Sequence, residues 1–404
     1  MATARHNFPL DQDPTLPGHP DPYPLFRELR ETEPVHFNPY MKGWVLARYD
    51  HALAYLRDHR FSRVAYLDRM RAEFGTDAPI IRFQSHELAF MDPPEHTWLK
   101  NVVGRAFSPQ VIAQSRAEIE ASVEEMLARA ADRDGMDIIA DLAYPLPAAV
   151  ISAMLGVPHR DRDMLRGWVD GIVASRGIVR TAEMMAEGDR SASAFHDYLE
   201  KLLTARRAKP ENDLLSGLIA AEERGRRFND EQTIAMIETL FAAGHATTRN
   251  LIANGTLALL RNPGEMRKLR ANPALIESAV EEMLRYDPPT QAPSPQAALE
   301  DVEIGGKKIR PGDTVTVLFG ATNRDPERFD DPDRFDIERQ DNEHLSFSHG
   351  THYCLGASLA RLEAQVAIAA LVRRFPKISL GTDALEWRKL GRFRGLVALP
   401  VVFG

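Results

Sequence analysis

The chain has 404 residues, 44% of them hydrophobic, which is enough to bury a large core, and its formal net charge is −8. This acidic balance argues against a nucleic-acid partner. A single cysteine excludes an intrachain disulfide and suits a reducing, cytoplasmic environment. The first 24 residues have neither the pattern of a signal peptide nor an apolar run long enough to span a bilayer, so no membrane contact is expected.

The N-terminal part combines an extended arm with short helices and a hairpin. Six prolines within residues 1–24 predict an arm that lies extended over the surface. The hydrophobic pattern then predicts a short helix, two hairpin strands and a second helix, over residues 25–30, 35–37, 44–47 and 51–58. Residues 61–90 show no clean period, so a long loop is expected there.

The next helix starts at Asp92-Pro93-Pro94-Glu95, because proline suits the first turn and an acidic residue favours the positive end of the helix dipole. His96 and Lys100 follow four residues apart and therefore project from one face. This spacing allows both side chains to reach one anion. A solvated helix face is the alternative interpretation.

The middle of the chain is expected to be helical. Five helices are predicted over residues 110–131, 148–155, 161–175, 184–207 and 213–223. A longer helix follows over residues 230–260, because Asn229 and Gln232 can form a capping box and Asn262-Pro263-Gly264 stops the helix.

The centre of this long helix consists of small residues. Glycine at position 244 costs helix stability, which suggests that something packs closely against the backbone there. The hydroxyl of Thr247 can reach the carbonyl oxygen of Ala243, four residues back, and open a local bulge in the helix.

Beyond residue 273 the pattern predicts one more helix and then short strands. The helix over residues 274–286 carries Glu282 and Arg285, which in isolation form a surface ion pair of little energetic value. Prolines then force residues 287–293 out of helical geometry. The strands expected over residues 302–304, 308–309 and 315–319 are predicted to form one small sheet.

The only cysteine, Cys354, lies between Gly350 and Gly356 in a tight loop. A lone cysteine is by default a small buried hydrophobe. Here, however, apolar residues repeat at helical spacing from Leu359 onwards, so Cys354 precedes a helix N-terminus. Unpaired N–H groups and the helix dipole favour a thiolate at such a position. The loop therefore indicates a thiolate ligand for a metal.

At this loop the chain resembles the cytochrome P450 superfamily. The haem-ligand motif of that family, Phe-x-x-Gly-x-His-x-Cys-x-Gly, is matched at Phe347, Gly350, His352, Cys354 and Gly356. The resemblance implies a mainly α-helical P450 fold with small β-sheets, in a single haem domain over residues 1–404. It also implies heme b as cofactor, with Cys354 as the iron ligand.

The resemblance assigns the cofactor's carboxylates to several side chains. His96 is expected to bind a haem propionate together with Lys100, which stands where the family usually has arginine and keeps the charge without the bidentate fork. Gln296 stands where an arginine commonly binds the second propionate. His352 and His96 are therefore expected to carry more of the anchoring.

Other roles follow from the same resemblance. Ala243, Gly244 and Thr247 are expected to cross the distal face of the haem, where the threonine hydroxyl helps to deliver protons to dioxygen. Thr290 and Phe393 are expected to line the substrate pocket, and their character suggests an apolar portion of the ligand. Glu282 and Arg285 are expected to be structural, in a buried network whose third member is either Arg334 or Arg339.

One position departs from the family pattern, because Ala246 stands where Glu or Asp is usual. A carboxylate with solvent access is the ordinary proton relay. Three explanations stay open: Thr247 with ordered water and a substrate group carries the protons, peroxide supplies oxygen that is already protonated, or Ala246 is an engineered substitution. His245 lies about 100° round the helix from that position and is expected to be structural.

The resemblance implies a monooxygenase that inserts one oxygen atom from O2 into an organic small molecule, by hydroxylation or oxidative dealkylation. No flavin- or nicotinamide-binding motif is found, so a ferredoxin and a ferredoxin reductase are expected as partners of a monomeric protein. Lys100, Arg105 and Arg361 are candidate docking charges. A peroxygenase driven by hydrogen peroxide and a non-enzymatic haem-thiolate sensor are the alternatives.

Four arginines fall in the expected loop above the pocket. Each could meet a substrate carboxylate or be solvated: Arg63, Arg69, Arg71 and Arg82.

Overall fold

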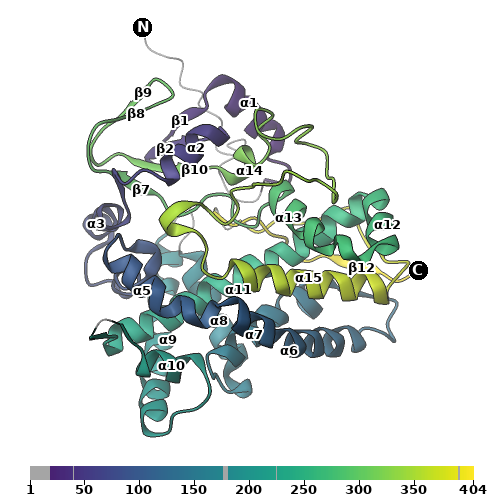
Figure 1. Cartoon of the computed structure of the whole chain (residues 1–404), viewed down its shortest axis with the longest axis horizontal. Coiled ribbons are helices and arrows are strands. Elements are labelled where there is room, and N and C mark those ends of the chain that lie inside the picture. Colours follow the sequence, from purple (N-terminus) through teal and green to yellow (C-terminus); the bar gives the residue numbers. More distant parts are fainter. Residues whose placement is uncertain (1–18, 40, 176–180, 224, 390–391) are drawn as a thin grey trace.

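A computed structural model of the chain describes residues 19–39, 41–175, 181–223, 225–389 and 392–404. Most of the arm predicted over residues 1–24 lies outside the described residues. The five-stranded sheet, a neighbouring hairpin and several short helices gather at one end of the molecule, whereas β12 (Pro400–Val402) lies among the longer helices that form the remainder (Figure 1). The predicted mainly helical architecture with small sheets is confirmed.

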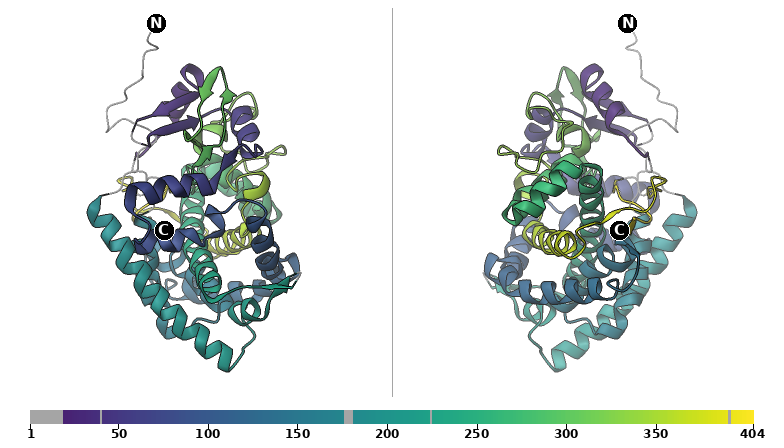
Figure 2. Two further views of the ribbon diagram at one scale, coloured as in Figure 1. Left: turned by 90° about the vertical axis from the view of Figure 1, so that its left-hand side faces the viewer. Right: turned by 90° about the vertical axis from the view of Figure 1, so that its right-hand side faces the viewer.

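Outside residues 61–90, the helices before the centre of the chain agree with the predicted pattern to within a few residues. They are α1 (Tyr23–Thr32), α2 (Tyr49–Leu56), α5 (Glu95–Gly104), α6 (Pro109–Ala128), α7 (Pro145–Met154), α8 (Arg162–Ala174), α9 (Ala182–Ala208) and α10 (Leu214–Ala220). Helix α9 packs along α8 and runs down one flank, at the end away from the larger sheet (Figure 2).

Helix α11 (Asp230–Arg261) forms the centre of the helical part. Its 32 residues extend about 48 Å. The predicted capping box is present, since the Asn229 side chain accepts from the Gln232 backbone and the Gln232 side chain accepts from the Asn229 backbone. The helix contacts α7, α8, α9, α13 and α15, so most of its surface is buried.

The C-terminal helices complete this core. They are α12 (Pro263–Ala271), α13 (Ile276–Tyr286), α14 (Phe319–Thr322) and α15 (Ala357–Arg374). Helix α15 packs against both α6 and α11, which places the start of α15 beside the central helix layer.

The larger sheet has five strands in the order β1-β2-β10-β7-β3. Its strands are β1 (Val35–Asn38), β2 (Gly43–Leu46), β3 (Phe61–Ser62), β7 (Gln296–Ala298) and β10 (Thr314–Val317). The predicted hairpin of β1 and β2 is confirmed, with Val35 opposite Leu46. Val315 and Val317 of β10 and Leu46 of β2 pack with Tyr55 and Phe61 in a second hydrophobic cluster.

The prediction of one sheet from the strands after residue 300 is wrong. Strands β8 (Val302–Ile304) and β9 (Lys307–Ile309) form a separate two-stranded hairpin. Strand β10 pairs instead with β2 and β7. All four residues of β10 are buried, and a strand buried on both faces belongs in the interior of a sheet. The remaining strands are β4 (Gly135–Asp137), β5 (Glu222–Glu223), β6 (Arg226–Arg227), β11 (Ser379–Leu380) and β12 (Pro400–Val402).

The long loop expected over residues 61–90 is also wrong. This segment holds β3, α3 (Arg63–Phe74) and α4 (Pro79–Ser85). The Ser62 side chain caps α3 by accepting from the Ala65 backbone at 2.9 Å, and proline begins α4. Both helices are short, and each buries only a few apolar side chains, so neither produces a long hydrophobic period.

Candidate active site

The loop before α15 holds Cys354 in a defined conformation. The Cys354 backbone N–H donates to the Phe347 carbonyl at 2.9 Å, which closes the loop on itself. Gly350 adopts φ +68°, and a Cβ there would lie 2.8 Å from the Leu56 carbonyl oxygen. Position 350 therefore requires glycine both for its backbone conformation and for its close approach to α2.

The Cys354 side chain is exposed, yet burial is the main cause that raises the pKa of its thiol. The Gly356 N–H and the positive charges of Arg361 and Lys100 oppose this rise. The helix start thus does not by itself produce the predicted thiolate, and a coordinated metal ion is what deprotonates such a thiol.

Lys100 fixes this loop from the outside. Its ammonium group donates to the carbonyl oxygens of Thr351 and Tyr353, at 2.7 and 3.0 Å. These contacts occupy two of its three donors. The Lys100 ammonium group thus contacts backbone carbonyls beside Cys354, whereas the sequence pattern predicted that it binds the same anion as His96.

His96 and His352 lie edge to face, with ring centroids 4.4 Å apart. Burial, with the positive charges of Lys100 and Arg63, lowers the pKa of His96 to about 4. Burial and the charge of Arg63 lower that of His352 to about 2. Among the described residues, His96 Nδ1 has no hydrogen-bond partner. Two neutral imidazoles beside nearby cations form a site suited to an anion. The neighbouring Asp92 carboxylate already accepts from the Ser62 hydroxyl and the Arg63 backbone N–H.

Three cofactor candidates remain, Gln296, Phe347 and Gly356. Gln296 begins β7 and is buried. The Phe347 ring packs against the Arg361 guanidinium, whose Cζ lies 4.5 Å from the ring centroid. A Cβ at Gly356 would meet no described atom within 4 Å, so the protein leaves open space beside this glycine.

The centre of α11 shows a small accessible window in a buried helix. Ala243 is exposed, Gly244 and Thr247 are half-buried, and most neighbouring residues are buried. The Thr247 hydroxyl donates to the Ala243 carbonyl at 2.8 Å, as predicted. The helix continues without interruption, however, so the expected bulge is absent. Small residues at this face leave room for a bulky group against the helix backbone.

His245 points away from this window. It is fully buried, and its Nε2 lies 3.1 Å from the Tyr144 carbonyl oxygen. Burial, with the charge of Arg249, lowers the pKa of His245 to about 4. The ring is therefore neutral and donates from Nε2, which agrees with the structural role expected from the sequence.

The pocket candidates are neighbours although they lie about 100 residues apart in the sequence. Thr290 and Phe393 form an isolated antiparallel bridge, and the Gln291 N–H donates to the Arg392 carbonyl at 2.7 Å. Both Thr290 and Phe393 are half-buried. The segment after α13 and the C-terminal hairpin are thus joined through their backbones and lie side by side.

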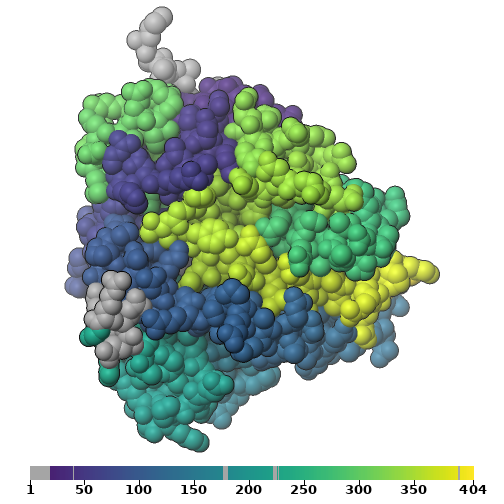
Figure 3. Space-filling view, in the orientation of Figure 1, coloured from purple at the N-terminus to yellow at the C-terminus, as the bar shows by residue number. Residues whose placement is uncertain are grey.

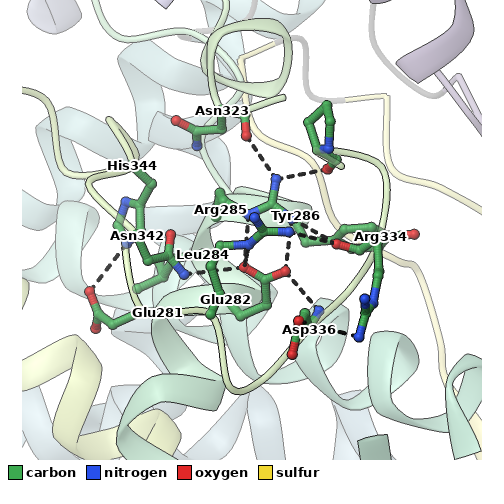
Figure 4. Close-up of polar contacts among 12 residues, drawn as sticks. Glu281, Glu282, Leu284, Arg285, Tyr286, Asn323, Arg334, Asp336, Asn342 and His344 are labelled. Atoms are coloured by element: carbon green, nitrogen blue, oxygen red, sulfur yellow. Dashed lines mark hydrogen bonds and ion pairs between the residues drawn. The ribbon is translucent and has the colours of Figure 1, made fainter. Parts of the chain in front are cut away.

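Glu282 lies at the centre of a buried polar network (Figure 4). Its carboxylate accepts from Arg285 Nε and Nη2 at 2.7 and 2.8 Å, and from Arg339 Nε at 3.2 Å. The Arg334 side chain instead pairs with Asp336 at 3.4 Å, while its carbonyl accepts from Arg285. Arg339 is therefore the third member of the network, a choice that the sequence left open.

Of the four arginines assigned to the expected loop, three make surface contacts. Arg69 contacts Thr314 and the Lys42 carbonyl, Arg71 pairs with Asp68, and Arg82 lies 3.9 Å from Glu231. Arg63 differs because it is only 4% exposed. Sequence analysis missed this burial, since the side chain was assigned to a loop rather than to the junction of β3 and α3.

Comparison with known proteins identifies this arrangement. The model of the cytochrome P450 family matches residues 44–384. The chain belongs to the cytochrome P450 family. It is 37% identical over 398 residues to the polyketide biosynthesis cytochrome P450 PksS of Bacillus subtilis, which covers 95% of this chain and 96% of that protein. It is 39% identical over 389 residues to the cytochrome P450 monooxygenase PikC of Streptomyces venezuelae, with coverage of 94% and 91%.

Solved P450 structures agree. P450BioI, in complex with an acyl carrier protein carrying hexadec-9Z-enoic acid, superposes with a TM-score of 0.90 at 37% identity, over 95% of this chain and 99% of that one. The predicted P450 fold is confirmed, and the protein is a P450 monooxygenase and thus an oxidoreductase. Among the described residues, no helix is both long and apolar enough to cross a membrane.

P450 membership implies a haem-thiolate cofactor, and the residues present fit one. The unpartnered His96 Nδ1 and the neutral His352 can face an anionic group, and the open space beside Gly356 lies next to the only thiol. When bound, a thiolate-ligated haem supplies the iron that activates oxygen.

Proposed function

We propose that this P450 inserts one oxygen atom from O2 into an organic small molecule, by hydroxylation or oxidative dealkylation, with Cys354 as the iron ligand of heme b. The observation that carries the proposal is the placement of the only cysteine, with an exposed side chain, in the closed loop just before α15. Lys100 and Gly350 keep that loop in place. A single free thiol also favours the cytoplasm as its compartment.

Cys354→Ala tests the ligand directly. The wild-type protein, purified with haem supplementation, should give the thiolate-type Soret band in its reduced carbon monoxide complex. Cys354→Ala should lose that band while its far-ultraviolet circular dichroism is unchanged. A wild-type protein that is folded but colourless, or whose iron is ligated by nitrogen, contradicts the proposal.

Electron supply by a ferredoxin and its reductase is part of the proposal, and Arg105 is the candidate docking residue chosen to test it. Arg361 is already paired with Glu281 at 2.7 Å, and Lys100 holds the cysteine loop, so reversing either charge disturbs the site itself. Arg105 is exposed at the end of α5. The segment around residue 350 reaches the surface close to the N-terminal elements and α5 (Figure 3).

Arg105→Glu should therefore slow reduction of the iron by ferredoxin without changing its reduction by dithionite. Arg116→Glu, at an exposed position on α6, is the matched charge reversal. Equal ferredoxin rates in the two variants and the wild type exclude Arg105 from the docking surface.

A peroxygenase is the second candidate, and Ala246 favours it. Ala246 is 1% exposed and apolar, and His245 is neutral with its Nε2–H committed to Tyr144. Thr247 is thus the polar side chain of the α11 window, and while its hydroxyl donates to Ala243 its lone pairs can accept from water or a substrate group.

Parallel assays with one substrate panel decide between the two electron sources. Product formed with ferredoxin, reductase and NADPH supports the monooxygenase cycle, whereas product formed with hydrogen peroxide alone selects the peroxygenase. The panel should contain polyketides and long-chain acids, since one relative is named for polyketide biosynthesis and one similar structure holds myristic acid. Failure with the whole panel revives the haem-thiolate sensor.

A further inference from the structure

Position 296, which the family pattern commonly fills with arginine, has a cationic neighbour on the adjacent strand. Strands β3 and β7 are antiparallel, with Phe61 opposite Ala298 and Ser62 opposite Ala297. Continuing this register by one residue places Arg63 opposite Gln296. Helix α3, which starts at Arg63, also packs on β7. Side chains at directly opposite positions lie close enough to share a partner.

The Arg63 guanidinium is a buried cation without a carboxylate partner among the described residues. It is 4% exposed, and its Nη1 donates to the carbonyl oxygens of Ser294 and Pro295. Its Nε has no partner. The nearby Asp92 carboxylate accepts instead from the Ser62 hydroxyl and from the backbone N–H of Arg63. A buried charge of this kind requires a counter-ion.

Arg63 is linked to the imidazole pair through Asp92, just before α5. The Arg63 backbone N–H donates to the Asp92 carboxylate at 2.9 Å, and the Asp92 carbonyl accepts from the His96 backbone N–H at 3.0 Å. The rings of His96 and His352 are 4.4 Å apart. Three elements therefore converge on one place: the β3–α3 junction, α5 and the cysteine loop. Lys100, the other cation here, is occupied by loop carbonyls.

We propose that Arg63 is the arginine that binds a haem propionate in this chain, in place of an arginine at position 296. The inference rests on the proposed haem site. A guanidinium can bind a carboxylate through two parallel hydrogen bonds, and a buried pair of this kind compensates the desolvation of both groups. Gln296, which is 8% exposed, occupies the position of the usual arginine but carries no positive charge.

The experiment measures haem retention. Ferric wild-type protein, R63Q, R63K and the cross-strand exchange R63Q/Q296R are mixed with excess apomyoglobin, and the rate of haem transfer is recorded. R63Q should lose haem roughly tenfold faster than the wild type, because one charge-assisted pair is removed. R63K should lie between them, and R63Q/Q296R should recover most of the loss.

The matched control is R30Q. Arg30 is 8% exposed, donates from Nη1 to the Ala321 carbonyl at 2.8 Å and has an unpartnered Nε, so it reproduces the burial and bonding of Arg63 at another site. Its haem transfer rate should stay close to that of the wild type. Thermal midpoints of the haem-free proteins separate a loss of folding stability from a loss of haem binding.

Equal haem transfer rates in R63Q and R30Q overturn the inference. If R63Q does not fold, the variants R63K and R63Q/Q296R still test the inference. Haem retention at the wild-type level in R63K, together with rapid haem loss from R63Q/Q296R, contradicts the role of Arg63. Unchanged haem retention in R63Q with weakened binding of carboxylate substrates assigns Arg63 to the substrate and likewise overturns the inference. A wild-type protein that binds no haem refutes the proposed function itself.

Discussion

Replacing Arg285 with methionine removes the main counter-charge of a carboxylate that has no contact with solvent. Arg285 and Glu282 are both 0% exposed. The change deletes two hydrogen bonds to Glu282 and three to the carbonyls of Asn323, Pro332 and Arg334. Breaking a buried pair by removing one partner costs about 3–5 kcal/mol. We expect Arg285→Met to lower the free energy of unfolding by about that amount.

Two matched variants set the scale. Arg339→Met leaves the pair of Glu282 and Arg285 intact and removes a side chain bonded to Glu282 at 3.2 Å, so a loss of about 1.5–3 kcal/mol is expected. Arg334→Met removes a side chain that is 57% exposed and pairs with Asp336, so the loss should be about 0–1 kcal/mol.

The assay is urea unfolding followed by circular dichroism and tryptophan fluorescence, with coincident transitions as the test of two-state behaviour. The loss in free energy of unfolding is expected to be largest for Arg285→Met, smaller for Arg339→Met and smallest for Arg334→Met. A loss for Arg334→Met equal to that of Arg339→Met refutes the assignment of Arg339 to the network, and a loss below about 1 kcal/mol for Arg285→Met refutes the electrostatic argument.

Three further outcomes are expected. Gly350→Ala forces φ +68° on alanine and places its Cβ 2.8 Å from the Leu56 carbonyl oxygen, so thermal denaturation should show a loss of folding stability of about 1–2 kcal/mol or more. Gly356→Ala, whose Cβ meets no described atom within 4 Å, should leave the stability of the haem-free protein unchanged and lower the haem-to-protein ratio. Burial raises the pKa of the Glu363 carboxyl from 4.5 to about 8, so folding favours its neutral form. The contribution of this carboxyl to the free energy of unfolding is therefore complete below pH 4.5 and is lost as the pH rises through about 8. Glu363→Gln should remove this loss in thermal midpoints measured across that range, and an unchanged profile contradicts the assignment. Ala246→Glu should raise the ratio of ferredoxin-supported to peroxide-supported product about tenfold or more in parallel turnover assays, and an unchanged ratio shows that position 246 does not limit proton delivery.

Predictions that depend on neighbours within a helical turn agree with the structure. The capping box at Asn229 and Gln232 and the hydrogen bond from Thr247 to Ala243 join residues three or four apart. In a helix, residues at that spacing are brought together by the backbone geometry alone. The bulge predicted from the same hydrogen bond is absent, since α11 stays regular through Thr247.

Predictions over residues 61–90 failed for the opposite reason. Helix α3 depends on a cap at Ser62 whose hydroxyl also donates to Asp92, thirty positions further along the chain. The helix buries few apolar residues, among them Leu67 and Met70, so its local pattern is weak. Its stability comes from packing on β7, which the local sequence does not contain.

From its own order of residues the chain determines the cysteine motif around Cys354, the long helix α11 and the pairing of Glu282 with Arg285, since each depends on residues only a few positions apart. Only the tertiary structure decided that Arg339 rather than Arg334 reaches Glu282, that β10 lies between β2 and β7, and that Arg63 is buried at the junction of β3 and α3. Those choices depend on which distant segments pack together, and several partners of equal local chemistry compete until burial selects one.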